Sequence, residues 1–141
     1  MPSLKQNPDG SLGIQGTQLD DGGFEIASFF WNVPNADISF FVADRPYRVK
    51  GIRARVDTAG TDAGAVSGAI KKAPSGTAVA SGTALHSGTI NLKGTAATNQ
   101  TITLSTTSTD LDIAAGDCIG FDLTGVGTAA VGSVTVTLAP K

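Results

Sequence analysis

Side chains that could support nucleophilic catalysis are scarce in this chain of 141 residues, which contains one histidine, His86, and one cysteine, Cys118. A nucleophile needs a base held beside it, and the base needs a group that orients it. No acidic residue lies near His86 in the sequence. We therefore expect His86 to occupy a surface loop and Cys118 to be buried, without a shared catalytic role.

Paired carboxylates are the second kind of chemistry that the sequence offers. Asp110 with Asp112, or Asp117 with Asp122, would bring two carboxylates onto neighbouring strands, as glycoside hydrolysis requires at a separation of roughly 5 to 10 Å. The chain has a single glutamate, Glu25, and few aromatic residues outside the expected core that would stack against a sugar. Aspartate at strand ends is usually turn chemistry, so we assign these residues to turns.

The loop at residues 57–64 contains two acidic residues and two glycines. It lacks the alternating oxygen ligands and the closing glutamate of a calcium-binding loop. Glycines elsewhere sit beside serine and threonine, without the lysine or the strand-to-helix context of a phosphate-binding motif. The sequence therefore predicts a protein that is not an enzyme, with no catalytic residue, no cofactor and no metal site.

Charge is concentrated in a basic segment. The net charge is −2, yet residues 1–44 contribute −5 and residues 45–55 contribute +5 without any acidic residue. Nucleic-acid-binding domains are usually basic overall, and this chain has a pI of about 5.1, so we expect no nucleic-acid partner. The expected partner is an acidic protein surface, which arginine binds through bidentate pairs. The basic residues are Arg45, Arg48, Lys50, Arg53 and Arg55.

Neutralisation within the chain, by Asp44, Asp57 and neighbouring strands, is the alternative interpretation of this basic segment.

The alternation of apolar and polar side chains in residues 47–56 predicts on which face of the strand the charges lie. It shifts by one position at Gly51, and a β-bulge at this glycine restores the register. One face of the strand is then apolar, and the other carries Arg48, Lys50, Arg53 and Arg55.

The composition predicts an all-β fold. Gly, Ala, Thr and Ser make up 65 of the 141 residues and glutamate occurs once, which disfavours a helical bundle. Short apolar–polar alternations between glycine-rich turns indicate two antiparallel sheets packed face to face, an antiparallel β-sandwich of jelly-roll-like type. The expected strands lie at residues 25–31, 38–43, 47–56, 66–71, 90–92, 102–104, 119–123 and 134–138.

The sequence also predicts two details of this fold. In the second strand we expect Ile38, Phe40 and Val42 to face inward and Phe41 to face outward. Three Ser-Gly-Thr copies, six residues apart, suggest a β-solenoid, but irregular hairpins are the preferred interpretation. The copies begin at Ser75, Ser81 and Ser87.

The domain organisation is predicted from the change in composition along the chain. Residues 1–23 are polar, contain five glycines and have irregularly spaced apolar residues, which predicts an extended N-terminal arm before a β-sandwich domain at residues 24–141. No apolar run approaches the roughly 18 to 20 residues that span a bilayer, and the first residues lack an apolar signal region. We therefore expect synthesis in the cytoplasm and no membrane partner, and the single cysteine excludes an internal disulfide.

Seven of the eight aromatic residues lie between Phe24 and Tyr47. Core packing is the default for any one of them, but an outward-facing ring would be an apolar anchor for a partner. The candidates for such a position are Phe29, Phe30, Trp31 and Phe41. The candidate protein-interface residues are the five basic side chains of residues 45–55 together with Phe29, Trp31 and Phe41.

Three stretches of the chain carry a family resemblance. Residues 41–64 read FVADRPYRVKGIRARVDTAGTDAG, residues 114–125 read AAGDCIGFDLTG, and residues 134–138 read VTVTL. Over residues 40–139 the chain resembles the decoration, or cement, proteins of tailed-phage heads, of the β-sandwich or jelly-roll type. The N-terminal arm is not part of this resemblance.

The resemblance implies a non-enzymatic virion structural protein on the capsid exterior, synthesised in the host cytoplasm. Its partner would be the major capsid protein, whose neighbouring subunits it would cement, and it would act as a homo-oligomer, a dimer or a trimer. The alternative function is a non-catalytic carbohydrate-binding β-sandwich module. That alternative predicts a solvent-exposed ring at Trp31 or Tyr47 for stacking against a sugar.

Overall fold

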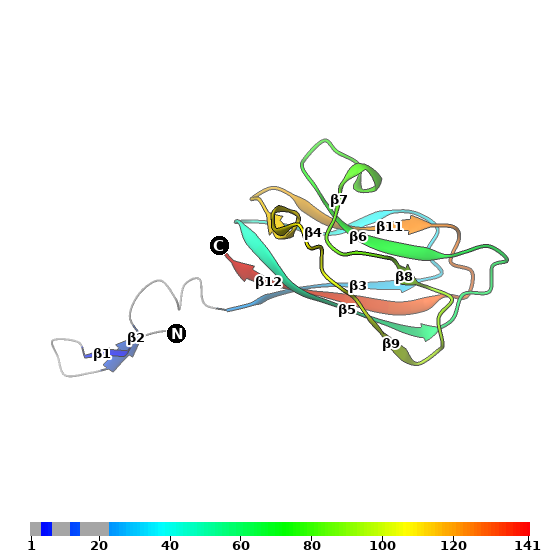
Figure 1. Cartoon of the computed structure of the whole chain (residues 1–141), viewed down its shortest axis with the longest axis horizontal. Helices are drawn as coiled ribbons and strands as arrows, with labels where there is room; N and C mark the ends of the chain where they lie inside the picture. The colour runs from blue at the N-terminus through cyan, green and yellow to red at the C-terminus, as the bar shows by residue number, and fades with distance from the viewer. Residues whose placement is uncertain (1–3, 7–11, 15–22) are drawn as a thin grey trace.

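Two antiparallel β-sheets lie face to face in the structure (Figure 1), a computed structural model that describes residues 4–6, 12–14 and 23–141. The strands of the two sheets are β3 (Glu25–Asn32), β4 (Ile38–Val42), β5 (Tyr47–Thr58), β6 (Ser67–Ala73), β7 (Thr83–Ala84), β8 (Ile90–Asn91), β9 (Thr98–Thr101), β10 (Asp112–Ile113), β11 (Cys118–Thr124) and β12 (Val131–Pro140). Within the described ranges the helical elements are two 3₁₀ turns, η1 (Val79–Ser81) and η2 (Ser108–Leu111).

The chain crosses between the two sheets from β3 to β6, stays in the β11 sheet through β7 and β8, passes to the β5 sheet for β9 and β10, and then crosses to β11 and back to β12. The β5 sheet has the order β10-β5-β12-β3, with β9 also paired to β5, and the β11 sheet has the order β4-β11-β6-β7, with β8 also paired to β6. β11 and β12 therefore return to lie between earlier strands, β11 between β4 and β6 and β12 between β3 and β5. This is the strand order of a jelly roll, which confirms the predicted fold class.

The predicted N-terminal arm, residues 1–23, falls largely outside the described residues. Within it, β1 (Leu4–Gln6) and β2 (Leu12–Ile14) form an antiparallel pair. The division into an arm at residues 1–23 and a sandwich domain at residues 24–141 stays a prediction.

The core lies between the inner faces of the two sheets. Alternate residues of β12, namely Val134, Val136 and Leu138, are at most 1% exposed, as their alternation predicts. Phe121 enters from the opposite sheet, and its ring centroid lies 5.6 Å from that of Trp31. Full burial of one such large apolar side chain contributes about 1.5–3 kcal/mol, so this inter-sheet layer supplies much of the stability of the sandwich.

The β-bulge predicted at Gly51 is present in β5. Thr137 and Leu138 of β12 lie opposite Gly51 and Val49, which leaves Lys50 as the extra residue. The apolar residues on both sides of the bulge are therefore buried on the same face. The opposite face carries Arg48, Lys50, Arg53 and Arg55, as predicted.

The prediction for β4 is right for Phe40, which packs against the core, but wrong for Ile38, Val42 and Phe41, because β4 also contains a bulge. The register with β11 shifts between Ile119 and Gly120, which lie opposite Phe41 and Ser39. Phe40 is therefore the extra residue. A bulge lets two consecutive side chains turn toward the same face.

Both phenylalanines of β4 pack against the core as a result. The ring of Phe40 stacks on Phe29 at 5.5 Å between centroids, and Phe41 meets Tyr47 edge-on at 5.8 Å. The residues that face solvent from this strand are instead Ile38 and Val42, which are 47% and 68% exposed.

Two further segments differ from the predicted strands. β9 occupies Thr98–Thr101, four residues earlier than expected, and Leu104 makes only an isolated bridge with His86. The three Ser-Gly-Thr copies adopt different local structures: a turn after Ser75, the end of η1 at Ser81 and a bend at Ser87. They do not form successive turns of a solenoid.

Gly68 of β6 provides a test of this packing, since a β-carbon at this position would overlap the ring of Phe121. We predict that Gly68→Ala lowers the free energy of unfolding by about 1–3 kcal/mol, the usual cost of overpacking a dense core, as measured by urea denaturation. Gly64→Ala is the matched control, because a β-carbon there meets no atom within 4 Å. It should change stability by less than about 0.5 kcal/mol, and equal losses in the two variants would contradict the packing.

Candidate protein-interaction surface

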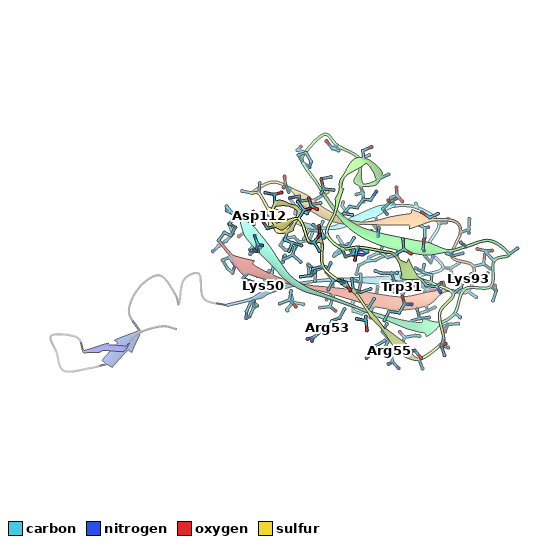
Figure 2. The ribbon with its side chains drawn as sticks, in the orientation of Figure 1. Trp31, Lys50, Arg53, Arg55, Lys93 and Asp112 are labelled. Carbon is cyan, nitrogen blue, oxygen red and sulfur yellow. The ribbon has the colours of Figure 1, made fainter. Side chains whose placement is uncertain are left out.

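On the outer face of the β5 sheet, the basic side chains of β5 lie opposite neutral residues of β12 and β9. Lys50, Arg53 and Arg55 follow β5 on the side that faces away from the β11 sheet (Figure 2). We call the outward residues Arg48, Lys50, Arg53 and Arg55 the basic face. Two rows of facing residues cross the sheet here, Phe30-Ser133-Arg55-Asn99 and Ser28-Thr135-Arg53-Thr101.

Part of the predicted basic segment is neutralised locally. Nε of Arg55 donates to Oδ1 of Asp57 at 3.1 Å, and its Nη1 donates to Oδ1 of Asn99 at 3.1 Å. Arg45, which lies before the start of β5, pairs with Asp44 at 3.2 Å. These contacts agree with the alternative interpretation of the basic segment, in which flanking aspartates neutralise the arginines.

Asp112 of β10 sits among three basic side chains. Nη1 of Arg48 and Nζ of Lys141 lie 3.0 Å and 3.1 Å from its Oδ1, and Nζ of Lys72 donates to its backbone carbonyl at 2.6 Å. The hydrogen bond from Lys141 does most to lower the pKa of Asp112, with Arg48 adding to it and burial opposing it. The sequence assigned Asp112 to a turn, because its position beside Arg48 arises from β10–β5 pairing between distant parts of the chain.

Lys50 and Arg53 differ from the other basic residues. Both are exposed, and neither makes an ion pair or a side-chain hydrogen bond with any residue that the structure describes. Arg53 lies between Thr135 and Thr101, which carry short neutral side chains. The uncompensated positive charge of the basic face is therefore located at Lys50 and Arg53.

The aromatic candidates are mostly core residues. Trp31 is 1% exposed, so its prediction as an interface residue is corrected: it faces inward from β3 and packs on Phe121. Phe29 and Phe41 are partly buried against the core. Tyr47 is 4% exposed, and burial of both Trp31 and Tyr47 counts against the carbohydrate-binding alternative.

Phe30 is the aromatic residue of β3 that the fold leaves outside, at 76% exposed. It shares its outward side with Ile26, which is 53% exposed, while Ala27 and Trp31 are buried on the inward side. Strict alternation along β3 separates these two sets. Alternation places Phe30 and Trp31 on opposite sides of the strand, but both sides carry apolar residues, so the pairing of β3 with β12 decides which ring lies outside.

Tyr47 is tied to the start of the basic segment by a short hydrogen bond. Its hydroxyl donates to Oδ1 of Asp44 at 2.6 Å. This bond raises the pKa of Tyr47 and lowers the pKa of Asp44. The contact positions the Asp44 carboxylate, which also accepts from Nε of Arg45.

His86 is buried, at 5% exposed, and does not occupy the surface loop that we expected. Its Nε2 accepts a hydrogen bond from the backbone N–H of Ile70 at 2.9 Å, and its Nδ1 lies 3.1 Å from the carbonyl oxygen of Ser87. A neutral ring with its proton on Nδ1 satisfies both contacts. Burial lowers the pKa of His86, and both ring nitrogens serve backbone groups of the fold.

The four aspartates considered for glycoside hydrolysis have local partners. Asp110 accepts from Oγ of Ser105 at 2.6 Å, Asp117 accepts from the N–H of Ala114 at 3.0 Å, and Asp122 pairs with Lys71 at 2.7 Å. Asp112 belongs to the basic cluster described above. The assignment to turns holds for Asp110 and Asp117, but it is wrong for Asp112 and Asp122, which lie in β10 and β11 and form ion pairs.

The loop at residues 57–64 is held by two side chains. Nζ of Lys93 donates to the carbonyl oxygens of Asp62 and Gly64 at 2.5 Å and 3.1 Å. A carboxylate oxygen of Asp62 accepts from the N–H of Thr128 at 3.1 Å. Hydrogen bonding to the Thr128 side chain, and then to this N–H, lowers the pKa of Asp62. Across residues 4–6, 12–14 and 23–141, no group of three or more His, Cys, Asp and Glu side chains is placed to hold a metal ion.

A concavity of about 310 Å³ lies at the turn between β3 and β4 and is lined by residues 29–38. Its one carboxylate, Asp37, accepts the backbone N–H of Leu123 at 2.8 Å. Neither His86 nor a second aspartate lines it.

None of the helical segments described is long and apolar enough to cross a membrane.

No protein-family model matches this chain, and no curated protein matches it either. The basic face is therefore interpreted from its own geometry, with Lys50 and Arg53 as its available charges.

The burial of His86 predicts a pH-dependent stability. Its folded pKa lies below the unfolded value near 6.5, so the unfolded chain binds a proton first, and the free energy of unfolding falls as the pH drops below about 6.5. Between about pH 7.5 and about pH 5, His86→Gln should therefore lose less stability than the wild-type protein in urea denaturation. The carboxylates with lowered pKa values reduce the free energy of unfolding in a separate pH range, below about pH 4.5, where they become protonated. Identical pH slopes in the two proteins would contradict a buried neutral imidazole.

Proposed function

We propose that this chain is a virion structural protein that binds the outer surface of a tailed-phage capsid and cements neighbouring subunits of the major capsid protein. It acts without catalysis, on the capsid exterior, after synthesis in the host cytoplasm. The observation that carries the proposal is the pair of uncompensated charges, Lys50 and Arg53, on the basic face. The resemblance of residues 40–139 to decoration proteins supports the same assignment.

The chemistry of the basic face suits a carboxylate-rich protein surface. The guanidinium of Arg53 presents a planar fork that pairs with a carboxylate through two hydrogen bonds, whereas Lys50 is a mobile point charge. The hydroxyl groups of Ser133, Thr135 and Thr137 lie along the adjacent strand β12. They add donors and acceptors without the bulk that would hold a flat partner away from Arg53.

Each of these contacts is weak alone. An exposed ion pair contributes at most about 1 kcal/mol, and salt screens it over a Debye length of about 8 Å at physiological ionic strength. A capsid repeats the same acidic site many times, and a protein that bridges two subunits makes its second contact at a high effective concentration. Cementing through the basic face is therefore compatible with modest contacts per copy, and it must depend on salt.

Co-sedimentation with undecorated capsids of the phage that encodes this chain tests the proposal. Purified protein should pellet with the capsids at low salt in a saturable ratio, and the bound fraction should fall as the salt concentration rises. Protein that stays in the supernatant at low salt would refute capsid binding.

Paired substitutions test the role of the basic face. Lys50→Ala with Arg53→Ala should weaken binding by about 5- to 30-fold, which corresponds to about 1–2 kcal/mol. Arg48→Ala with Arg55→Ala is the matched control, since it removes the same net charge from side chains that Asp112 and Asp57 already neutralise. It should weaken binding less, and an unchanged affinity of the first variant would remove the basic face from the binding site.

A further inference from the structure

β3 leaves one long side of the β5 sheet open. It pairs with β12 in an unbroken register, from Glu25 opposite Leu138 to Asn32 opposite Val131. Its other edge has no partner strand among the described residues. The eight residues of β3 include no proline, lysine or arginine, and its only charged side chain is Glu25. Proline and charged side chains, lysine above all, are features by which natural edge strands prevent pairing with another chain. Apart from Glu25, β3 lacks them.

The other edges of the sandwich are protected. On the far side of the β5 sheet, β10 has two residues and β9 has four. In the β11 sheet, β7 and β8 have two residues each, and β4 has five residues interrupted by its bulge. Short strands and bulges are both devices that blunt an edge, so the contrast singles out β3.

The exposed apolar side chains gather at the same place. Six of the seven exposed large hydrophobic residues among those described lie within residues 24–42. β3 and β4 lie at the same open side of the sandwich, as the stacking of Phe29 on Phe40 indicates. The six residues are Phe24, Ile26, Phe30, Val33, Ile38 and Val42.

The direction of the free backbone groups follows from one hydrogen bond. The N–H of Val33 donates to the carbonyl oxygen of Ala130, just beyond the ends of β3 and β12. Backbone groups of successive residues in a strand point to alternate sides. The N–H and C=O groups of Ile26, Ser28 and Phe30 therefore point to the open edge.

We propose that two copies of this chain pair antiparallel through the β3 edge, with a two-fold axis at Ser28. In this register Ile26 of each copy lies opposite Phe30 of the other, so that both exposed apolar residues of the strand are covered. Ser28 lies opposite itself, and each of these three residue pairs exchanges two backbone hydrogen bonds. The two Glu25 side chains are six residues out of register, about 20 Å apart, so they do not repel.

A second copy fits this edge better than an unrelated strand, because the outward sequence Ile26-Ser28-Phe30 has apolar residues placed symmetrically about a small central one. A two-fold contact uses the open edge of both copies and closes at two. The two β5 sheets then form one continuous sheet, and Lys50 and Arg53 of both copies lie on the same side of it. The pairing stands independently of capsid binding.

Sedimentation equilibrium of the full chain tests the pairing. The wild-type protein should be a dimer, and Phe30→Lys should raise the dimer dissociation constant at least tenfold, as should Ile26→Lys. Both positions are exposed, so at protein concentrations well below the dimer dissociation constant, where pairing adds no stability, the variants should unfold at the wild-type urea concentration. Val126→Lys is the matched control: it places the same charge on a 52% exposed apolar residue between β11 and β12, and it should remain a dimer.

A disulfide cross-link tests the position of the axis. Ser28→Cys should give a disulfide-linked dimer on mild oxidation, since facing residues of an antiparallel pair lie about 5.5 Å apart, within the range of a disulfide. Thr135→Cys, which faces the same way from the central strand β12, should not, and neither should the wild-type protein with Cys118. A protein that is monomeric at every concentration overturns the proposal. That result is expected if another segment of the same chain, or a different protein, covers the edge instead. A trimer, a larger assembly, or a dimer that survives both lysine substitutions overturns the proposal equally.

Discussion

One extra residue in β5, Lys50, keeps the two sides of the β5 sheet chemically separate. Without this bulge the strand after Gly51 would turn by one position, which would send Arg53 and Arg55 into the core and bring Ile52 to the surface. Burial of an unpaired charge costs several kcal/mol, against a net stability of about 5–15 kcal/mol for a domain. The sandwich core and the exposed charges of the basic face therefore depend on the same local irregularity.

The abundance of small residues has a specific location in this fold. A β-carbon at Gly132 would overlap the indole of Trp31, and one at Gly68 would overlap the ring of Phe121. The two rings that stack between the sheets are thus accommodated by glycines in the strands around them. The aromatic residues, seven of which lie between Phe24 and Tyr47, can fill the core because glycines in other strands make room for their rings.

Alternation along single strands was enough to predict the sandwich and the outward side of β5, because a half-buried strand carries this pattern in its own residues. The features that sequence analysis missed depend on pairing between distant strands. Phe40 is bulged because of its register with β11, His86 is buried where it accepts from Ile70, and Arg48 meets Asp112 across 64 positions. The inward side of β3, and with it the burial of Trp31, is likewise set by the register with β12.

The register of β3 with β12 also sets how the sandwich responds to mechanical force. Glu25 and Leu138 face each other at one end of the pair. A force that pulls residue 24 away from residue 139 acts at that end and peels the hydrogen bonds apart one after another. A force along the axis of β3 shears all of them at once and meets much greater resistance. The fold is therefore mechanically anisotropic: it is soft to peeling at the start of β3 and stiff to tension along the strand.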